Sequence, residues 1–248
     1  MVNPALVVVA EASGVLAVVK PAGLPTQAPP GIDSAEYRVR RLVQAGAGAA
    51  ANAPYLGVPH RLDRAVSGVL LFATTPRAAR KLSRQFERRE VTKTYLAIVA
   101  SAAGAECPPA SGGPPAEWRD WIEKVPDEPR ARRVEPSQAG NAKEAVTRAQ
   151  LLGRIADDRI ALQLEPLTGR MHQLRLQAAC RGLPVVGDEL YGGPAGIAGI
   201  VADDPRSRPI ALHAWRIRYL DPDTGEPITR EAPLPDWWPP IDKSRQNE

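Results

Sequence analysis

The chain has 248 residues, 24 % of them charged and 44 % hydrophobic, a composition typical of a globular protein with a sizeable core. Lys and Arg exceed Asp and Glu by 32 to 28, and the Arg residues cluster, which favours a polyanionic partner over a membrane. The N-terminus lacks the pattern of a signal peptide, and no apolar run reaches the roughly 18 residues of a bilayer span. The distant cysteines Cys107 and Cys180 indicate free thiols in a reducing cytoplasm, not a zinc or redox pair.

The first third of the chain predicts two strands and a helix. Apolar runs at 6–10 and 15–19 flank Ser13-Gly14, which is typical of two short strands joined by a turn. The segment from Lys20 to Pro25 ends the second strand abruptly. Apolar spacing over 34–45 predicts a helix. An Ala/Gly-rich connector over 46–54 follows that helix.

The middle of the chain starts with a polar segment at 60–68 and a buried strand at 69–73. Thr75-Pro76 then opens a helix, since Pro is favoured at the first helical position. Another strand is predicted at 93–100. Residues 101–116 hold Ala, Gly, Ser and Pro with almost no charge, and we expect a flexible surface insertion there.

The last half of the chain predicts further strands and one more helix. Strands are expected around Trp121, around Ala145-Val146 and at 160–164. A helix from about Thr168 to Cys180, capped near Gly182, follows them. A last strand is expected at 210–220, and the Pro-rich tail frays over 241–248. Many strands with a few helices make the fold class α+β or mixed α/β.

The segment 60–68 places one carboxylate, Asp63, between two guanidinium groups, Arg61 and Arg64. Nearby positive charge keeps a carboxyl group ionised. Asp63 is therefore either a structural clamp paired with Arg61 or Arg64, or a nucleophile or base. Taken alone, the clamp is the simpler interpretation. The second interpretation needs other segments that complete a reaction site.

The segment 168–177 is the first of these. Arg170 and His172 lie near the start of the predicted helix, where the helix dipole disfavours cations. An anion, either a phosphate or a carboxylate, would explain their placement, and a solvated first turn is the alternative. On the strand at 93–100, Lys93 and Tyr95 share one face. Tyr95 either packs against the sheet or offers a surface on which a base stacks.

The helix that starts at Pro76 carries an excess of positive charge. From Arg77 to Lys93 seven basic residues oppose two acidic ones, Glu87 and Glu90. Such a run is either a solvated face or a surface that follows phosphates, and the Arg residues at 130, 132 and 133 extend it in the second case. The basic residues are Arg77, Arg80, Lys81, Arg84, Arg88, Arg89 and Lys93.

Together these segments resemble the RluA-like family of RNA pseudouridine synthases, over roughly residues 6–235. Five motifs occur in the family's order: Lys20 to Pro25; His60 to Asp63 with Ser67-Gly68; Lys93 to Ala97; Thr168 to Arg170 with His172 to Arg175; and Gly187-Asp188 with Tyr191-Gly192. The resemblance implies isomerisation of uridine to pseudouridine in structured RNA, either rRNA or tRNA, without metal or cofactor. It also implies a mostly antiparallel mixed sheet with flanking helices around a central RNA-binding cleft. We expect one catalytic domain over 1–240, with no separate N-terminal RNA-binding domain, in a monomeric protein.

The resemblance also implies roles for individual residues. Asp63 is expected to be the nucleophile, and it either attacks C1′ or abstracts a sugar proton to give a glycal. Tyr95 is expected to stack on the target base, and Arg175 to pair with the Asp63 carboxylate. Further substrate-binding residues are expected to shape the loop, wall the pocket or contact RNA: His60, Arg61, Arg64, Arg84, Arg88, Arg170, His172, Leu174 and Leu176.

The chain departs from the family's pattern at Ala65-Val66, Met171 and Gln177, which bears on the choice of target. Three alternatives to the synthase remain on the residues alone. An RNA-binding or RNA-chaperone module of the same fold would need no catalysis. A hydrolase built on His60 and Asp63 lacks a G-x-S-x-G elbow, and a metal enzyme would have to use three His residues without ligand spacing.

Overall fold

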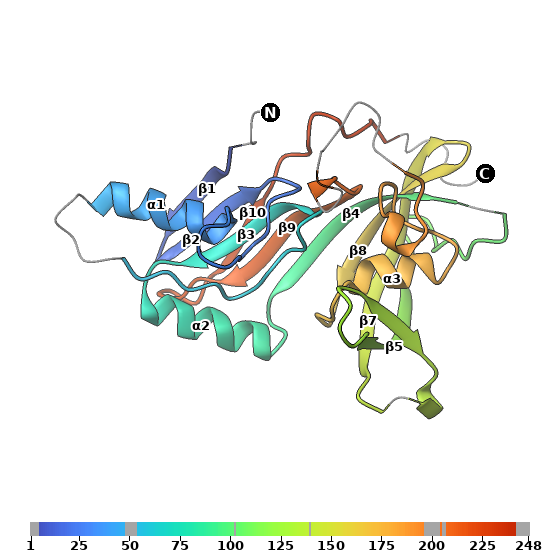
Figure 1. Cartoon of the computed structure of the whole chain (residues 1–248), viewed down its shortest axis with the longest axis horizontal. Coiled ribbons are helices and arrows are strands. Elements are labelled where there is room, and N and C mark those ends of the chain that lie inside the picture. The colour runs from blue at the N-terminus through green and yellow to red at the C-terminus, as the bar shows by residue number, and fades with distance from the viewer. Residues whose placement is uncertain are drawn as a thin grey trace. The chain divides into compact units, whose positions relative to one another are not determined.

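The computed structural model describes residues 5–47, 54–101, 103–138, 140–195, 204 and 207–241. The chain forms two compact units (Figure 1). The first takes the described residues of Met1–Lys93, Ala202–Pro209 and Ala214–Leu234. The second takes those of Thr94–Val201, Ile210–His213 and Pro235–Glu248.

The first unit contains a sheet in the order β1-β2-β3-β9, with β10 paired to β9. The printed pairs β1–β2, β2–β3 and β9–β10 are antiparallel, and Lys20 stands opposite Gly68 in the second of them. Figure 1 shows the two helices of this unit beside its strands. The elements are β1 (Val7–Ala12), β2 (Val15–Lys20), α1 (Ala35–Ala47), β3 (Ser67–Ala73), α2 (Pro76–Glu87), β9 (Leu212–Leu220) and β10 (Pro227–Glu231).

Helix α2 starts where the sequence predicts. The Thr75 hydroxyl accepts a hydrogen bond from Ala78 N at 3.1 Å, and Pro76 occupies the first turn. Ala78 and Leu82 pack into the core of the first unit, against Val15, Ala17, Val69, Leu71 and Ile217. Burial of this apolar face against β2, β3 and β9 fixes the helix on the sheet.

The second unit contains strands in the order β4-β8-β7-β5-β6, and each neighbouring pair among them is antiparallel. Helix α3 packs on it through Leu176, which contacts Ile122, Ala131 and Ala145 in a buried cluster. The first two residues of β4 belong to the first unit, and the first two of β9 to the second. The elements are β4 (Thr92–Ala100), β5 (Ala116–Lys124), β6 (Ala131–Val134), η1 (Pro136–Gln138), β7 (Lys143–Ala156), β8 (Arg159–Pro166), α3 (Gln173–Ala179) and η2 (Glu189–Tyr191).

The α+β class with antiparallel sheets and flanking helices is confirmed, and so are the strands predicted in chain order up to 160–164. The prediction that a helix starts at Thr168 is wrong, because α3 starts at Gln173. The Thr168 hydroxyl accepts from Val146 N at 2.9 Å and donates to Gln173 Oε1 at 2.7 Å, so it joins the turn to β7. The residue that caps α3 is His172, in the left-handed region with φ 51°.

Two short strands were not predicted. The strand at 210–220 is not the last one, because β10 pairs with it, and β6 pairs with β5. Helix α3 ends at Ala179 with Cys180 as its cap, and Gly182 follows with a positive φ of 71°.

Three predicted irregular segments have different outcomes. Within the expected insertion, Ser111 N bonds to Leu151 O and Leu151 N to Pro109 O, each at 2.9 Å, and flexibility of this segment stays a prediction. The expected connector over 46–54 falls largely on 48–53, outside the described residues. The tail beyond Ile241 also lies outside them.

Candidate active site

The loop that carries Asp63 is held on both sides of that residue by the segment after β2. Gly23 N donates to Arg64 O at 2.8 Å, and Arg64 Nε donates to Gly23 O at 2.9 Å. The Thr26 hydroxyl donates to Leu62 O at 2.8 Å and accepts from Leu62 N at 3.0 Å. A further bond from Val66 N to Asp63 O, 3.1 Å long, closes a turn. The backbone on either side of Asp63 therefore has a fixed course.

Lys20, the last residue of β2, contacts the Asp63 loop, which the sequence did not reveal. Its side chain is fully buried, and Nζ donates to Leu24 O at 2.7 Å, Pro21 O at 2.9 Å and Arg64 O at 3.3 Å. Burial lowers the pKa of Lys20 from 10.5 to about 7, and the Asp63 charge opposes that shift. The signal for this residue was a lysine at the end of an apolar strand, directly before proline.

His60 shapes the loop through its ring. The ring stacks on Phe86 of α2 at 4.8 Å between centroids, and Nε2 accepts a hydrogen bond from Leu71 N at 3.0 Å. Burial, with a smaller effect of the Lys93 charge, lowers the pKa of His60 from 6.5 to about 3. The imidazole is therefore neutral at physiological pH, with Nε2 as the acceptor. A contact of His60 with a displaced nucleotide stays a prediction.

The two arginines beside Asp63 differ in their surroundings. The Arg64 guanidinium bonds to Gly23 O, to the Ser207 hydroxyl at 2.7 Å and to Asp204 Oδ2 at 3.2 Å. The Arg61 side chain is exposed. The Arg64 guanidinium is thus held by Gly23, Ser207 and Asp204, and the interpretation of Asp63 as a clamp stays a hypothesis. Contact of either arginine with RNA stays a prediction.

Gly68 is required by close packing within the first unit. Its φ is 128°, and a Cβ atom there would lie 2.3 Å from Ala214 O on β9. No side chain fits at that distance, so β3 and β9 can approach only if this residue is glycine. The Ser67-Gly68 part of the motif thus places the strand that follows the Asp63 loop.

The second unit carries the other two expected catalytic residues. Tyr95 lies on β4, half-buried, with Leu164 of β8 as its partner in the ladder. Arg175 is buried on α3, and its guanidinium forms a bidentate ion pair with Asp188. Asp188 belongs to a recognised motif for which the sequence suggested no role. The pairing of Arg175 with Asp63 stays a prediction.

The expected RNA contacts near α3 have structural partners within the second unit. Arg170 Nε donates to Glu144 O at 2.9 Å, and His172 Nδ1 lies 2.9 Å from the Tyr191 hydroxyl oxygen. Leu174 and Leu176 are both buried, and Leu176 packs in the core cluster. Their proposed contacts with substrate stay predictions.

Gln177, one of the departures from the family pattern, is also buried and fully engaged. Its Oε1 accepts from the Thr147 hydroxyl at 2.6 Å, and Nε2 donates to Asp120 Oδ2 at 2.7 Å. This side chain therefore joins α3 to β7 and β5. Its position in the core argues that this departure concerns packing of the second unit.

The predicted basic surface of α2 exists, although Lys93 does not belong to it. Lys93 is half-buried on β4, and burial lowers its pKa. Arg77 pairs with Asp223 at 3.3 Å, and Arg88 lies 3.9 Å from Glu90. The exposed basic residues of this surface, called the α2 stripe below, are Arg77, Arg80, Lys81, Arg84, Arg88 and Arg89.

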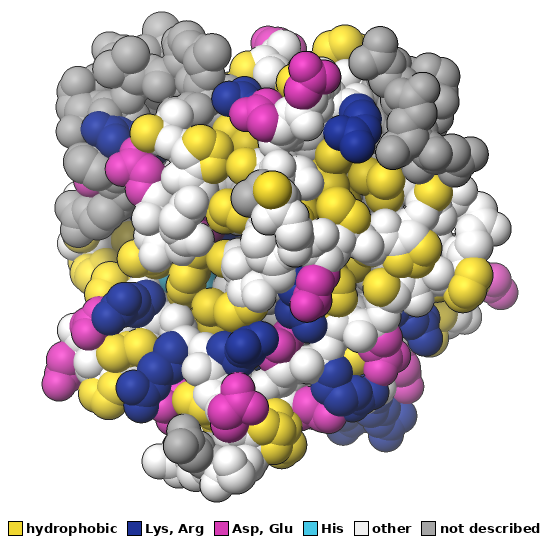
Figure 2. Space-filling view, turned by 90° about the vertical axis from the view of Figure 1, so that its right-hand side faces the viewer, with side chains coloured by type: hydrophobic (Ala, Val, Ile, Leu, Met, Phe, Trp, Pro, Cys, Tyr) yellow, Lys and Arg dark blue, Asp and Glu magenta, His cyan; other side chains and the backbone are white. Residues whose placement is uncertain are grey.

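The three arginines near β6 offer less uncompensated charge than the α2 stripe. Arg130 pairs with Glu128 at 2.5 Å, and Arg132 with Glu123 at 2.6 Å. Arg133 lies 3.7 Å from Asp120. In the face shown in Figure 2, Lys and Arg side chains likewise lie beside Asp and Glu side chains. The extension of the α2 stripe by these arginines stays a prediction.

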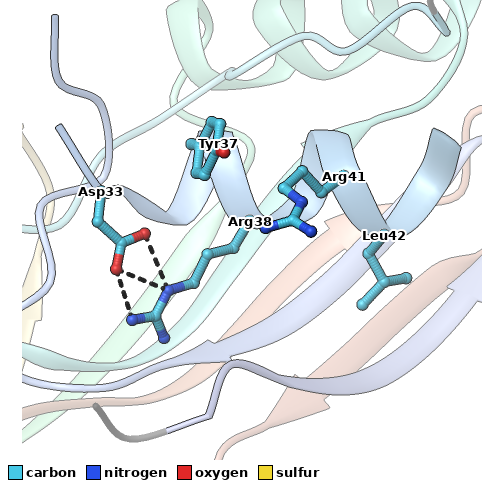
Figure 3. Close-up of a pocket in the computed structure, with 5 residues that line it drawn as sticks. All are labelled: Asp33, Tyr37, Arg38, Arg41 and Leu42. Atoms are coloured by element: carbon cyan, nitrogen blue, oxygen red, sulfur yellow. Dashed lines mark hydrogen bonds and ion pairs between the residues drawn. The ribbon is translucent and has the colours of Figure 1, made fainter. Parts of the chain in front are cut away.

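An open pocket lies on α1, and its lining includes none of the predicted site residues (Figure 3). Its lining is Asp33, Tyr37, Arg38, Arg41 and Leu42. The Arg38 guanidinium is tied to Asp33, with Nη2 and Oδ2 2.7 Å apart, and the Arg41 guanidinium lies 5.9 Å from the Tyr37 ring. None of these five residues belongs to a recognised motif.

The described part of the chain shows neither a metal-binding cluster nor a membrane-spanning helix. Within it, no group of three or more His, Cys, Asp and Glu side chains is placed to hold a metal ion. None of its helices is both long and apolar enough to cross a membrane. Cys107 and Cys180 are free thiols, as predicted.

Known proteins resemble this chain in sequence and in fold. The RNA pseudouridylate synthase family model matches residues 14–180. A dual-specificity RNA pseudouridine synthase RluA of Haemophilus influenzae is 32% identical over 233 residues, which cover 93% of this chain and 94% of the relative. A ribosomal large subunit pseudouridine synthase D of Xanthomonas campestris is 35% identical over 188 residues, 74% of this chain. The matched region spans 53% of that relative and 64% of a Xylella fastidiosa homologue with the same name.

Two human structures share the fold. Human RNA Pseudouridylate Synthase Domain Containing 1 superposes with a TM-score of 0.66 at 27% identity, covering 93% of this chain and 84% of that structure. Human RNA Pseudouridylate Synthase Domain Containing 4 gives a TM-score of 0.71 at 23% identity, covering 93% of this chain and 89% of that structure, which supports the fold. The region matched by the family model, residues 14–180, includes Asp63, Tyr95 and Arg175, the three expected catalytic residues. The chain belongs to the RluA-like family of RNA pseudouridine synthases.

Proposed function

We propose that this protein isomerises uridine to pseudouridine in structured RNA. The observation that carries the proposal is the family match over residues 14–180, which contains all three expected catalytic residues. The hydrogen-bonded frame around Asp63 supports it, because a reacting carboxylate needs a fixed backbone. The names of the relatives favour ribosomal RNA of the large subunit as substrate, and a tRNA substrate remains part of the proposal.

The reaction exchanges one glycosidic bond of the target uridine for another. The N1–C1′ bond breaks, the uracil turns, and a C5–C1′ bond forms, while C5 loses a proton to solvent and N1 gains one. A base stacked in RNA must first be flipped out, which costs a few kcal/mol. Stacking on the Tyr95 ring returns about 1–3 kcal/mol of that cost.

Asp63 has to act as a carboxylate, either on C1′ directly or as a base that generates a glycal. Cations nearby favour the charged form. In this proposal Arg175 is the partner that holds the carboxylate, and the buried Lys20 ammonium adds positive potential from the loop side. No metal or cofactor is required for these steps, and we propose that the enzyme uses none.

The remaining residues serve RNA binding in this proposal. His60 and Arg61 shape the loop around the displaced nucleotide, and Leu174 and Leu176 provide apolar surface near the base. Arg64, Arg170 and His172 contact phosphates, and Arg84 and Arg88 do so on the α2 stripe. We further propose that both units act together as one catalytic domain over 1–240 in a monomeric cytoplasmic protein. The two free thiols fit a reducing compartment.

The test is release of tritium from RNA that carries uridine tritiated at C5. We expect wild-type protein to release tritium from one RNA of the cell, identified first by pseudouridine mapping with and without the gene. Asp63→Asn should abolish release while RNA affinity stays within about threefold. Asp33→Asn, which removes another carboxylate of the same unit, is the control and should keep full activity. Normal turnover by Asp63→Asn would refute the proposed role, and binding without any turnover by wild-type protein would favour an RNA-binding module.

A further inference from the structure

The Arg175 guanidinium is fixed along one edge by a buried carboxylate. Nε donates to Asp188 Oδ2 at 2.6 Å, and Nη2 donates to Asp188 Oδ1 at 2.7 Å. The two side chains are 8% and 1% exposed. A bidentate pair of this kind sets the plane of the guanidinium as well as its position. It uses two of the five N–H donors of arginine, those on Nε and Nη2.

The face of the same guanidinium is fixed by a tyrosine. The Tyr191 ring lies 5.2 Å from Arg175 Cζ, within the range of a cation–π contact. The Tyr191 hydroxyl in turn accepts a hydrogen bond from Ala131 N at 2.9 Å and lies 2.9 Å from His172 Nδ1. Tyr191 is therefore anchored both to β6 and to the residue that caps α3.

The turn that presents both supporting residues has little freedom. Asp188 N donates to Val185 O at 3.0 Å, and Gly193 N donates to Asp188 O at 2.9 Å. A Cβ atom on Gly193 would lie 2.1 Å from Val185 O, so this close approach requires glycine. The recognised motif from Gly187 to Gly192 thus builds a support for one side chain of α3.

We propose that Asp188 and Tyr191 are positioning residues for Arg175. They occupy one edge and one face of the guanidinium, which directs its Nη1 side toward the anionic group of the reaction. The inference rests on the proposed function, in which Arg175 holds the reacting carboxylate. Arginine has a long side chain, and holding it in advance removes an ordering step from the transition state.

The central test is a double-mutant cycle on the single-turnover rate at saturating enzyme. We expect Asp188→Asn to lower that rate about 10- to 100-fold while the RNA dissociation constant changes less than about threefold. In an Arg175→Lys background the same substitution should cause no further loss, because lysine cannot use the bidentate support. Equal, additive losses in both backgrounds would overturn the proposal, and so would a wild-type rate in Asp188→Asn.

A control and a milder variant separate positioning from folding. Asp120→Asn breaks another buried ion pair of the same unit, with Arg181 at 2.9 Å, and should lower stability but leave the rate unchanged. Tyr191→Phe removes a single oxygen, and we expect about a 3- to 10-fold loss of rate that disappears in the Arg175→Lys background. If Asp188→Asn does not fold, this second cycle decides. An inactive Asp63→Asn beside a fully active Tyr191→Phe and Asp188→Asn would overturn this inference alone, whereas an active Asp63→Asn would overturn the proposed function.

Discussion

Acid stability offers a direct test of the neutral state of the half-buried His60 ring. The folded protein holds the pKa of His60 at about 3, against 6.5 for an unperturbed histidine. Because the folded state resists protonation, the unfolded state binds more protons below pH 6.5, and stability falls as pH drops through that range. Protonation of His60 in the unfolded chain lowers the free energy of unfolding by RT ln(1 + 10^(6.5 − pH)) as long as the folded form remains neutral. Between pH 7 and pH 5 His60 alone therefore lowers the free energy of unfolding by about 2 kcal/mol.

The assay is urea unfolding of wild-type protein and His60→Gln at pH 7, 6 and 5. Gln keeps an acceptor for the Leu71 amide, does not titrate, and loses the stack on Phe86. We expect the variant to be less stable than wild-type protein at pH 7. At pH 5 the difference between their free energies of unfolding should be smaller by about 2 kcal/mol, which corresponds to about 1 M in urea midpoint. An NMR titration of the His60 ring should show no protonation above pH 4. Stability curves that stay parallel from pH 7 to 5, or a ring that titrates near pH 6, would refute the argument.

Three further outcomes are expected. The first concerns replacement of three basic residues of the α2 stripe, Arg80, Lys81 and Arg84, with Gln. The slope of log RNA affinity against log salt concentration should become shallower by about 2, because each lost phosphate contact contributes about 0.7. An unchanged slope would exclude the helix from RNA contact. Gly68→Ala should lower the free energy of unfolding, measured in urea, by at least about 3 kcal/mol, because the new Cβ atom meets Ala214 O. Gly31 also has a positive φ but has open space around it, so Gly31→Ala should lower the free energy of unfolding by only about 1–2 kcal/mol. Similar losses in both would contradict the steric explanation. The pKa of Lys20 is lower in the folded protein than in the unfolded chain, so the folded state becomes more stable as pH rises. The free energy of unfolding of wild-type protein should therefore increase by about 2 kcal/mol between pH 7 and pH 9. Lys20→Met should lack this increase in the same assay.

The elements that the sequence predicts well are those whose signal is local. The runs 15–19 and 69–73, which form most of β2 and β3, are apolar throughout, and Thr75-Pro76 predicts the start of α2. The start of α3 was placed too early because the Thr168 hydroxyl binds Val146, a partner in another element that no local pattern reveals. Strands β6 and β10 are short and largely polar, and they form only because a neighbouring strand offers hydrogen bonds.

The same distinction applies to the candidate site. The motif around Asp63 is visible in the sequence, and so is the basic surface of α2. Lys20 and Asp188 were seen only as members of motifs, because their roles depend on partners elsewhere in the chain: Arg64 O for Lys20, and the Arg175 guanidinium for Asp188. Residue types alone suggest what chemistry is available, whereas the partner of a buried charge is decided by tertiary packing.

The reciprocal bonds of Gly23 with Arg64 and of Thr26 with Leu62 also matter for protein engineering. Two segments about forty positions apart act as a single exchangeable part, since each supplies the donors that the other's backbone requires. A chimera that takes the Asp63 loop from a relative should therefore inherit residues 20–26 from that same relative. Swapping only one of the two would leave buried amide and carbonyl groups without partners, although no residue of the Asp63 motif itself had changed.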